Sequence, residues 1–335
     1  MHGTRIVLSE AIPLAHPLTI HIEVTNRCNF SCQYCPESLP DFQSRVGGFN
    51  FLSLDEFKTI ARQIADVGKA AVLRLWIMGE PLLNKQLFNM IEFVKKSNYN
   101  IADRVEITTN ASLLTTENIS KLIESGVDVC KISIYGFGTR FNEITQSKIP
   151  SDKIFSNVAN LYRHRNLTRA STNIIVKMVD PRDSEELTEF KLRYGPISDH
   201  LEVFSPHSWA EEHSVKIYER NNSNKSIIKE RLKLTQKDVC AFPFYTLSIH
   251  ANGDVSVCCV DWEKKTLLGN VFTEQLIDIW RGQALKRIQN AHLKKNRTEI
   301  NGCNACNYFY DNCPENLDAD AEAILRRIAQ NAEVD

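Results

Sequence analysis

The sequence lacks the features that mark membrane proteins, nucleic-acid-binding proteins and several common classes of hydrolase. No stretch approaches the ~20 apolar residues of a membrane-spanning helix. The formal net charge is -1 at pH 7, so nothing draws the chain generally to nucleic acid or to an anionic membrane. The nine histidines form no HExxH pair, and neither a GxSxG motif nor a Walker loop is present. These absences disfavour a nucleic-acid substrate and a membrane partner, and they predict a cytoplasmic protein.

Cysteine is plentiful by contrast. Ten cysteines in a reducing compartment indicate metal binding or catalysis more than disulfides. Cys28, Cys32 and Cys35 form a CxxxCxxC loop directly after an alternating apolar segment that predicts a strand. Thiolates favour zinc, copper(I) or iron–sulfur clusters, and three ligands would leave one iron of a cubane cluster open. A structural zinc site or a buried group of thiols is the alternative for this loop, although structural zinc usually has four ligands.

The CxxxCxxC loop is similar to the signature of the radical S-adenosylmethionine (radical SAM) superfamily. The resemblance implies that the open iron of a 4Fe-4S cluster binds the amine and carboxylate of SAM. It also implies that an electron from the reduced cluster cleaves SAM to methionine and a 5′-deoxyadenosyl radical. The cofactor then carries the chemistry, while the protein orients the substrate and excludes side reactions. Tyr34, before the third cysteine, fits the family pattern and is expected near the adenine.

A second motif follows the second predicted strand. Gly79, Glu80 and Pro81 are similar to the family's GGE-type segment, which contacts the SAM amino group through its backbone and carboxylate. Met78 stands where the family has the first glycine. An ordinary turn between a strand and a helix would also use glycine and proline, so this segment alone is a weak signal.

Two further segments resemble the family after the third strand and in the fourth. Thr109 and Asn110 look like its TNG stretch near the SAM carboxylate and ribose, with Ala111 in place of glycine. Ser133 resembles the serine that faces SAM in its ISIDG strand, and Tyr135 replaces the aspartate. Thr and Asn are also common turn residues. The order of the motifs along successive strands favours a SAM site.

Strand-like apolar segments alternate with helical patterns through the first 205 residues. Six strands separated by helices imply a parallel sheet of an α/β protein, either doubly wound or barrel-like. Functional motifs at the strand ends favour a barrel, and the resemblance implies a partial (β/α)6 radical SAM barrel followed by a small cysteine-rich α+β domain of the twitch type. The predicted strands are 18–24, 71–77, 104–108, 129–134, 173–179 and 201–204, and the helices are 53–67, 85–97, 116–125, 152–163 and 184–194. The predicted units are an N-terminal extension (1–17), the barrel (18–205), a polar linker (206–236), the auxiliary cluster domain (237–316) and a C-terminal helix (317–335).

Four later cysteines are enough to complete a second cluster without an open iron. Asn252-Gly253 predicts a hairpin between 246–250 and 254–257, which brings Cys258 to a strand end. The pattern resembles the SPASM/twitch domains of radical SAM enzymes, in the shorter twitch form with one auxiliary 4Fe-4S cluster. A zinc ribbon is the alternative, because the spacing from Cys303 to Cys306 is itself zinc-like. The resemblance selects as ligands Cys240, Cys258, Cys303 and Cys306, although the adjacent Cys259 could replace Cys258.

Three cysteines remain without a predicted cluster. Cys130 falls within an apolar strand and is expected to pack there. Cys259 and Cys313 are candidate hydrogen donors to a substrate radical, and a structural role is equally compatible with each.

The sequence therefore predicts a radical SAM oxidoreductase with SAM and two 4Fe-4S clusters as cofactors. We expect it to oxidise or epimerise a hydroxylated small molecule, with flavodoxin or ferredoxin as the reducing partner. Peptide or protein modification is the second enzymatic alternative, against which stand the roughly seventeen residues before the first strand, too few for a peptide-recognition domain. A non-catalytic iron–sulfur or zinc-binding protein is the alternative of another class, and it would neither bind nor cleave SAM.

Overall fold

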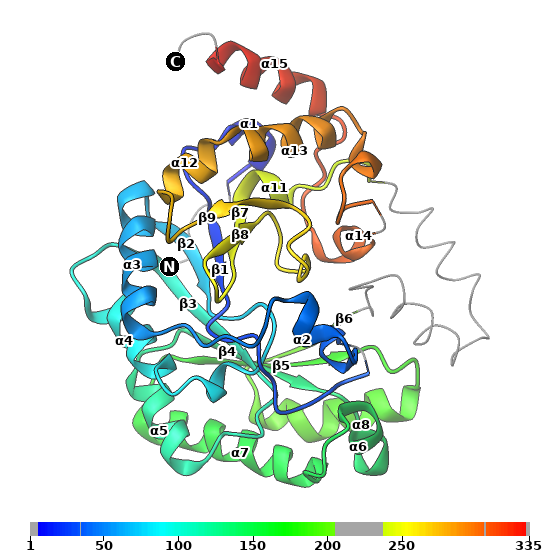
Figure 1. The fold of residues 1–335 in the computed structure, drawn as a ribbon. Coiled ribbons are helices and arrows are strands. Elements are labelled where there is room, and N and C mark those ends of the chain that lie inside the picture. The colour runs from blue at the N-terminus through cyan, green and yellow to red at the C-terminus, as the bar shows by residue number, and fades with distance from the viewer. Residues whose placement is uncertain (1–5, 34, 205–236, 305, 333–335) are drawn as a thin grey trace.

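The computed structural model describes residues 6–33, 35–204, 237–304 and 306–332. Tyr34 and the predicted linker lie outside the described residues. The strands form one nine-stranded sheet in the order β6-β5-β4-β3-β2-β1-β7-β8-β9, which does not close on itself (Figure 1). The first six strands pair in parallel with their sequence neighbours, so the predicted partial barrel is confirmed. They are β1 (Thr19–Ile22), β2 (Ala70–Arg74), β3 (Ala102–Thr109), β4 (Val129–Ile134), β5 (Asn173–Val179) and β6 (His200–Phe204).

Helices cover the outer face of this parallel sheet (Figure 1). The predicted start of the first long helix is confirmed, because Ser53 and Glu56 form a reciprocal capping box there. Its apolar face, including Phe57 and Ile60, is fully buried against the sheet. The predicted helices are α3 (Leu54–Val67), α4 (Leu87–Lys96), α5 (Thr116–Glu124), α7 (Ser151–Thr168) and α8 (Ser184–Tyr194).

Two α-helices of the barrel were not predicted, the short α2 (Phe42–Arg45) and α6. α6 (Gly138–Thr145) lies between β4 and α7, and its first residue is a glycine with no capping side chain before it. Burial of Phe141 and Ile144 stabilises it in place of a strong local signal. The helix predicted over 152–163 extends to Thr168, where Arg165 forms an ion pair with Asp199 at 2.8 Å.

The cysteine-rich C-terminal part does not form a separate sheet. Strand β7 (Thr246–Ile249) pairs in parallel with β1, and the antiparallel strands β8 (Asp254–Ser256) and β9 (Leu267–Asn270) extend the sheet beyond it. The predicted hairpin around Asn252-Gly253 is confirmed by the pairing of β7 with β8. The auxiliary part is therefore joined directly to the strand that precedes the cysteine loop.

A second hydrophobic core holds the two ends of the chain together. Leu8 of α1 (Leu8–Ala11) packs in it with Phe309 and with Ile324 of α15 (Ala321–Ala332). Arg327 donates a hydrogen bond to the carbonyl of Ser9. Leu8 and Ile12 thus belong to the core of the C-terminal part. The other α-helices are α2 (Phe42–Arg45), α11 (Phe242–Tyr245), α12 (Leu276–Arg281), α13 (Gln283–Leu293) and α14 (Tyr308–Asn312). Within the described ranges, every helix is too short or too polar to cross a membrane.

Candidate functional site

A cavity opens at the C-terminal ends of strands β1 to β5, and we name it the barrel cavity. It encloses about 700 Å³, counting the space that opens to solvent. Of the described residues predicted for the SAM site, only Pro81 does not border it; this proline is buried at the start of the 3-10 helix Pro81–Leu83. The lining residues are Cys28, Phe30, Cys32, Cys35, Glu37, Trp76, Ile77, Met78, Gly79, Glu80, Thr108, Thr109, Asn110, Ser133, Tyr135 and Lys177.

The three thiols of the loop suit an iron–sulfur cluster. Burial raises the pKa of each of them, and coordination to a metal is what would hold buried cysteines as thiolates. The Cys28 sulfur accepts hydrogen bonds from the Phe30 N–H at 3.5 Å and the Asn110 amide at 3.8 Å. Hydrogen bonds to cysteine sulfurs tune clusters of this kind. No three His, Cys, Asp or Glu side chains within the described ranges are grouped so as to hold a single ion.

Glu80 joins two strand ends beside these thiols. Its side chain is buried, and its Oε1 accepts a hydrogen bond from the Thr109 hydroxyl at 2.7 Å and one from the Leu82 N–H at 3.1 Å. Its Oε2 accepts one from the Asn110 N–H at 2.7 Å. Burial raises the pKa of Glu80 to about 7, against the lowering effect of these hydrogen bonds. Both oxygens are used within the protein, so in this structure Glu80 holds the Thr109-Asn110 segment in place.

Glu37 borders the same cavity, and no motif predicted it. Its Oε1 accepts a hydrogen bond from the Gly79 N–H at 2.7 Å. Burial, with the nearby charges of Glu23 and Glu80, raises the pKa of Glu37 to about 8. The residue therefore connects the cysteine loop to the segment after β2, a contact between positions 42 apart in the sequence.

The four later cysteines also come together. They border a second cavity of about 410 Å³, including its opening, which we name the auxiliary cavity. Burial raises the pKa of Cys303 to about 12, so the argument for a metal-held thiolate applies here too. The lining residues are Cys240, Phe242, Pro243, Val257, Cys258, Val260, Asp261, Thr266, His292, Arg297, Gly302, Cys303, Cys306, Tyr308 and Phe309.

His292 supplies an independent indication that the auxiliary cavity receives a hydrogen-bond acceptor. The side chain is fully buried, and its Nδ1 accepts a hydrogen bond from the Cys240 N–H at 3.3 Å. The proton of a neutral ring is therefore on Nε2, and burial lowers the His292 pKa to about 4, which keeps the ring neutral. Within the described ranges this Nε2 has no hydrogen-bond partner. Cluster sulfurs accept such hydrogen bonds, so the donor set fits an iron–sulfur cluster.

Comparison with known families gives this geometry a name. The model of the radical SAM superfamily matches residues 22–190, which is half of the chain. The chain belongs to the radical SAM superfamily. A second model, an iron–sulfur cluster-binding domain called SPASM, matches residues 240–307 and includes all four cysteines of the auxiliary cavity. Membership in this superfamily favours iron–sulfur clusters over the zinc alternatives. The cofactors of this enzyme are therefore SAM, a SAM-binding 4Fe-4S cluster and auxiliary iron–sulfur binding in the SPASM region.

Several relatives illustrate the range of radical SAM enzymes that this chain resembles. It is 34% identical over 121 residues to the PqqA peptide cyclase of Bradyrhizobium diazoefficiens, covering 36% of this chain and 29% of that protein. The structure of Streptococcus suis SuiB bound to its precursor peptide SuiA superimposes with a TM-score of 0.62 at 16% identity, covering 91% of this chain and 72% of SuiB. BtrN in complex with AdoMet and 2-DOIA gives a TM-score of 0.56 at 18% identity, covering 90% and 97%. The chain spans less than half the length of the curated relatives that it matches, and the two structures show a shared fold.

The two thiols considered as hydrogen donors lie in different places. Cys313 is buried in the second core, hydrogen-bonded to Cys240, and it borders neither cavity. Cys259 contacts Cys258 and the ring of His21, a residue of β1. Of the two, Cys259 is the one beside the barrel strands of this radical SAM enzyme.

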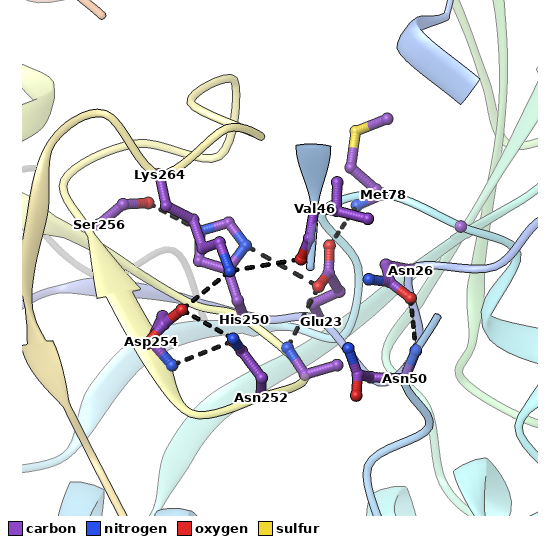
Figure 2. A network of polar contacts seen from close by, with 12 residues as sticks. Glu23, Asn26, Val46, Asn50, Met78, His250, Asn252, Asp254, Ser256 and Lys264 are labelled. Carbon is purple, nitrogen blue, oxygen red and sulfur yellow. Dashed lines mark hydrogen bonds and ion pairs between the residues drawn. The ribbon is translucent and has the colours of Figure 1, made fainter. Parts of the chain in front are cut away.

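A buried network connects the barrel cavity to the auxiliary hairpin (Figure 2). The carboxylate of Glu23 accepts hydrogen bonds from the Met78 N–H at 3.3 Å and the Ala251 N–H at 3.1 Å, and it lies 3.8 Å from Nδ1 of His250. Burial alone would raise the Glu23 pKa, but His250 and the two N–H groups hold it below its ordinary value. His250 in turn lies 3.0 Å from the Ser256 hydroxyl. The radical SAM motif after β2 is thereby tied to β8, which ends two residues before Cys258.

Gly79 is required by a close approach of two backbones. It has φ +77°, and a Cβ there would lie 2.4 Å from the Thr25 carbonyl oxygen. We expect Gly79→Ala to lower the free energy of unfolding by more than the ~1–2 kcal/mol of left-handed strain, because a backbone oxygen must also move. Urea denaturation of the apoprotein measures the loss. Gly138 is the matched control, since it has φ +51° and no described atom within 4 Å of its added Cβ. Equal losses in Gly79→Ala and Gly138→Ala would show that the close approach is unimportant.

Proposed function

We propose that this radical SAM enzyme removes a hydrogen atom from a peptide or protein substrate bound between the barrel cavity and the auxiliary cavity. The support comes from the similarity to the PqqA peptide cyclase and to SuiB bound to its precursor peptide. This proposal reverses the preference for a hydroxylated small molecule that we drew from the sequence. The observation that supports it is that the two cavities border strands of one continuous sheet, so that in this proposal a single bound substrate contacts both cofactor sites.

In this proposal Cys28, Cys32 and Cys35 hold the SAM-binding cluster, and Cys240, Cys258, Cys303 and Cys306 hold the auxiliary cluster. When bound, SAM and the reduced cluster supply a 5′-deoxyadenosyl radical. The Asn110 amide steadies the Cys28 sulfur, and Glu80 fixes the position of that amide segment. Phe30, Trp76 and Met78 form an apolar part of the wall of this cavity. None of the ten cysteines forms a disulfide, as suits a cytoplasmic enzyme that receives electrons from flavodoxin or ferredoxin.

Oxidation or epimerisation of a hydroxylated small molecule is the second candidate function. It is favoured by the similarity to BtrN, of which the chain covers 97%. The two candidates differ in the chemistry of the substrate, so they can be separated before the substrate is identified.

The test uses the reconstituted enzyme under anaerobic conditions with SAM and a reductant. Extract of the source cells is added, and formation of 5′-deoxyadenosine above the substrate-free rate is measured. We expect stimulation that disappears when the extract is first treated with a protease that is then inactivated. Stimulation that survives protease but is destroyed by periodate, which cleaves vicinal diols, would replace the peptide proposal with the hydroxylated small molecule.

A further inference from the structure

The buried positions of α13 are apolar except for one histidine. Leu285, Ile288 and Leu293 are buried, and His292 is fully buried one helical turn after Ile288. A polar ring at such a position costs free energy unless its nitrogens find hydrogen-bond partners. An apolar side chain would avoid that cost, so packing alone does not explain the histidine.

One ring nitrogen of His292 fixes the ring beside a proposed cluster ligand. Nδ1 accepts the hydrogen bond from the Cys240 N–H at 3.3 Å, so a neutral ring carries its proton on Nε2. Gln289, one turn earlier on α13, donates a hydrogen bond to the Pro243 carbonyl at 2.9 Å and holds the same segment against the helix. Both Pro243 and His292 border the auxiliary cavity. The ring is therefore held at the wall of this cavity by two contacts between α13 and residues 240–243.

The two charged side chains around the auxiliary cavity are engaged with protein groups. Asp261 accepts hydrogen bonds from the Thr266 N–H at 2.7 Å and from the Thr266 hydroxyl at 2.6 Å. Arg297 donates one to the Cys306 carbonyl at 3.3 Å. Among the buried side-chain nitrogen and oxygen atoms of the residues that the structure describes around this cavity, only Nε2 of His292 has no partner. A donor left over at the wall that four thiols share points to an acceptor held by those thiols.

We propose that Nε2 of His292 donates a hydrogen bond to a sulfur of the auxiliary cluster and thereby raises the reduction potential of that cluster. Reduction adds negative charge to a cluster, so an N–H that donates to its sulfur stabilises the reduced form more than the oxidised form. A higher potential makes the cluster a better acceptor of one electron. The proposal rests on the four lining cysteines as ligands, which is part of the proposed function, but not on the identity of the substrate.

The test is a redox titration of the auxiliary cluster, followed by electron paramagnetic resonance, in the full reconstituted chain that carries Cys32→Ala. We expect this background to bind the auxiliary cluster alone, so that the signal belongs to one cluster. H292N and H292Q are compared in it. An asparagine can still accept from the Cys240 N–H but has no donor at the reach of Nε2, whereas a glutamine places an amide N–H near that position. The pair therefore separates the donor from the rest of the ring.

We expect H292N to lower the potential of the auxiliary cluster by about 59 mV or more, which is roughly a tenfold shift in a one-electron equilibrium. H292Q should restore most of the potential measured with His292 in place. The matched control is H200N, because His200 is an exposed histidine at the first residue of β6 and borders neither cavity. Its potential should equal that of the background chain.

The outcomes separate a hydrogen bond to the cluster from a merely structural role of the ring. An unchanged potential in H292N would overturn the proposal, and a buried water would then be the partner of Nε2. An equal fall in H292N and H292Q would assign the effect to packing and overturn it as well. Loss of the auxiliary iron from H292N but not from H292Q supports the bond, whereas its loss from both variants contradicts it. The absence of any cluster signal from the Cys32→Ala chain would refute the ligand assignment and the proposal together. No substrate is present, so a failure of the extract assay leaves these results unchanged and remains distinguishable.

Discussion

Replacing Cys28, Cys32 or Cys35 by alanine should abolish the cleavage of SAM to 5′-deoxyadenosine. Each thiol borders the barrel cavity, and a cluster that keeps one iron open for SAM has no spare protein ligand to lose. We expect anaerobic reconstitution to give about eight irons per chain in the wild type and about four in each variant, because a 4Fe-4S cluster carries four irons. The measurements are iron content and chromatographic detection of 5′-deoxyadenosine after reduction with SAM present.

The matched control for these variants is Cys130→Ala. Cys130 is fully buried on the helix side of β4 and borders neither cavity. Its loss removes one sulfur from a packed core, at a cost of about 1–2 kcal/mol, and should leave about eight irons and full SAM cleavage. Cleavage by a Cys32→Ala variant that retains all its irons would contradict the assignment of the loop as the SAM-binding ligand set. Retained circular dichroism in each variant shows that folding has not failed, which matters because cluster binding is coupled to folding.

Much of the barrel could be predicted because its strands and helices carry strong local signals. The alternating segments and the Ser53 cap specify their elements without help from distant residues. The pairing of β7 with β1 could not be predicted in the same way. It joins Thr19 to Thr246, and both strands are buried on all sides, so neither shows the pattern of an edge or of a particular neighbour. Only the assembled sheet reveals that the auxiliary hairpin continues the barrel.

The candidate site likewise contains residues that could be predicted from the sequence and residues that could not. The cysteines were predictable because few chemical functions need thiols at such spacings. Glu23, Glu37, His292 and Lys177 were not, because a lone charged residue in a strand or loop has no sequence pattern and acquires its role from contacts with distant elements. His292, for instance, meets Cys240 from a position 52 residues away.

Ala111 shows how a departure from a family pattern can be tolerated. It stands where the resemblance to the family expects glycine, and its φ of +61° is in the left-handed region that glycine adopts freely. The strain is opposed by two hydrogen bonds: the Ala111 N–H donates to the Thr109 hydroxyl at 3.0 Å, and its carbonyl accepts from Asn157 of α7 at 2.9 Å. The backbone conformation of the motif is therefore kept without its usual residue.

Cys303→Ala should retain SAM cleavage and lose substrate turnover, whereas the alanine variants of Cys28, Cys32 and Cys35 should lose SAM cleavage itself. The two cavities share no lining residue, so loss of an auxiliary ligand leaves the SAM-binding thiols and their hydrogen bonds in place. We expect the iron content to fall from about eight to about four per chain while 5′-deoxyadenosine is still formed. Turnover of the substrate should stop, because an auxiliary cluster that accepts electrons from it would be missing. Iron analysis, substrate-free SAM cleavage and the extract assay measure these three quantities on one preparation.

Cys313→Ala is the control that makes this prediction specific to the cavity. Cys313 contacts Cys240 but borders neither cavity, so its removal should leave about eight irons if the four lining cysteines are the ligands. A loss of iron in Cys313→Ala equal to that in Cys303→Ala would make Cys313 a ligand and exclude one of the four. If Cys303→Ala instead lost SAM cleavage as completely as Cys32→Ala, the two clusters would not have separate roles. The Glu23 network, which ties Met78 to the auxiliary hairpin, would then be a physical connection to examine, because it is a buried path between the two sites.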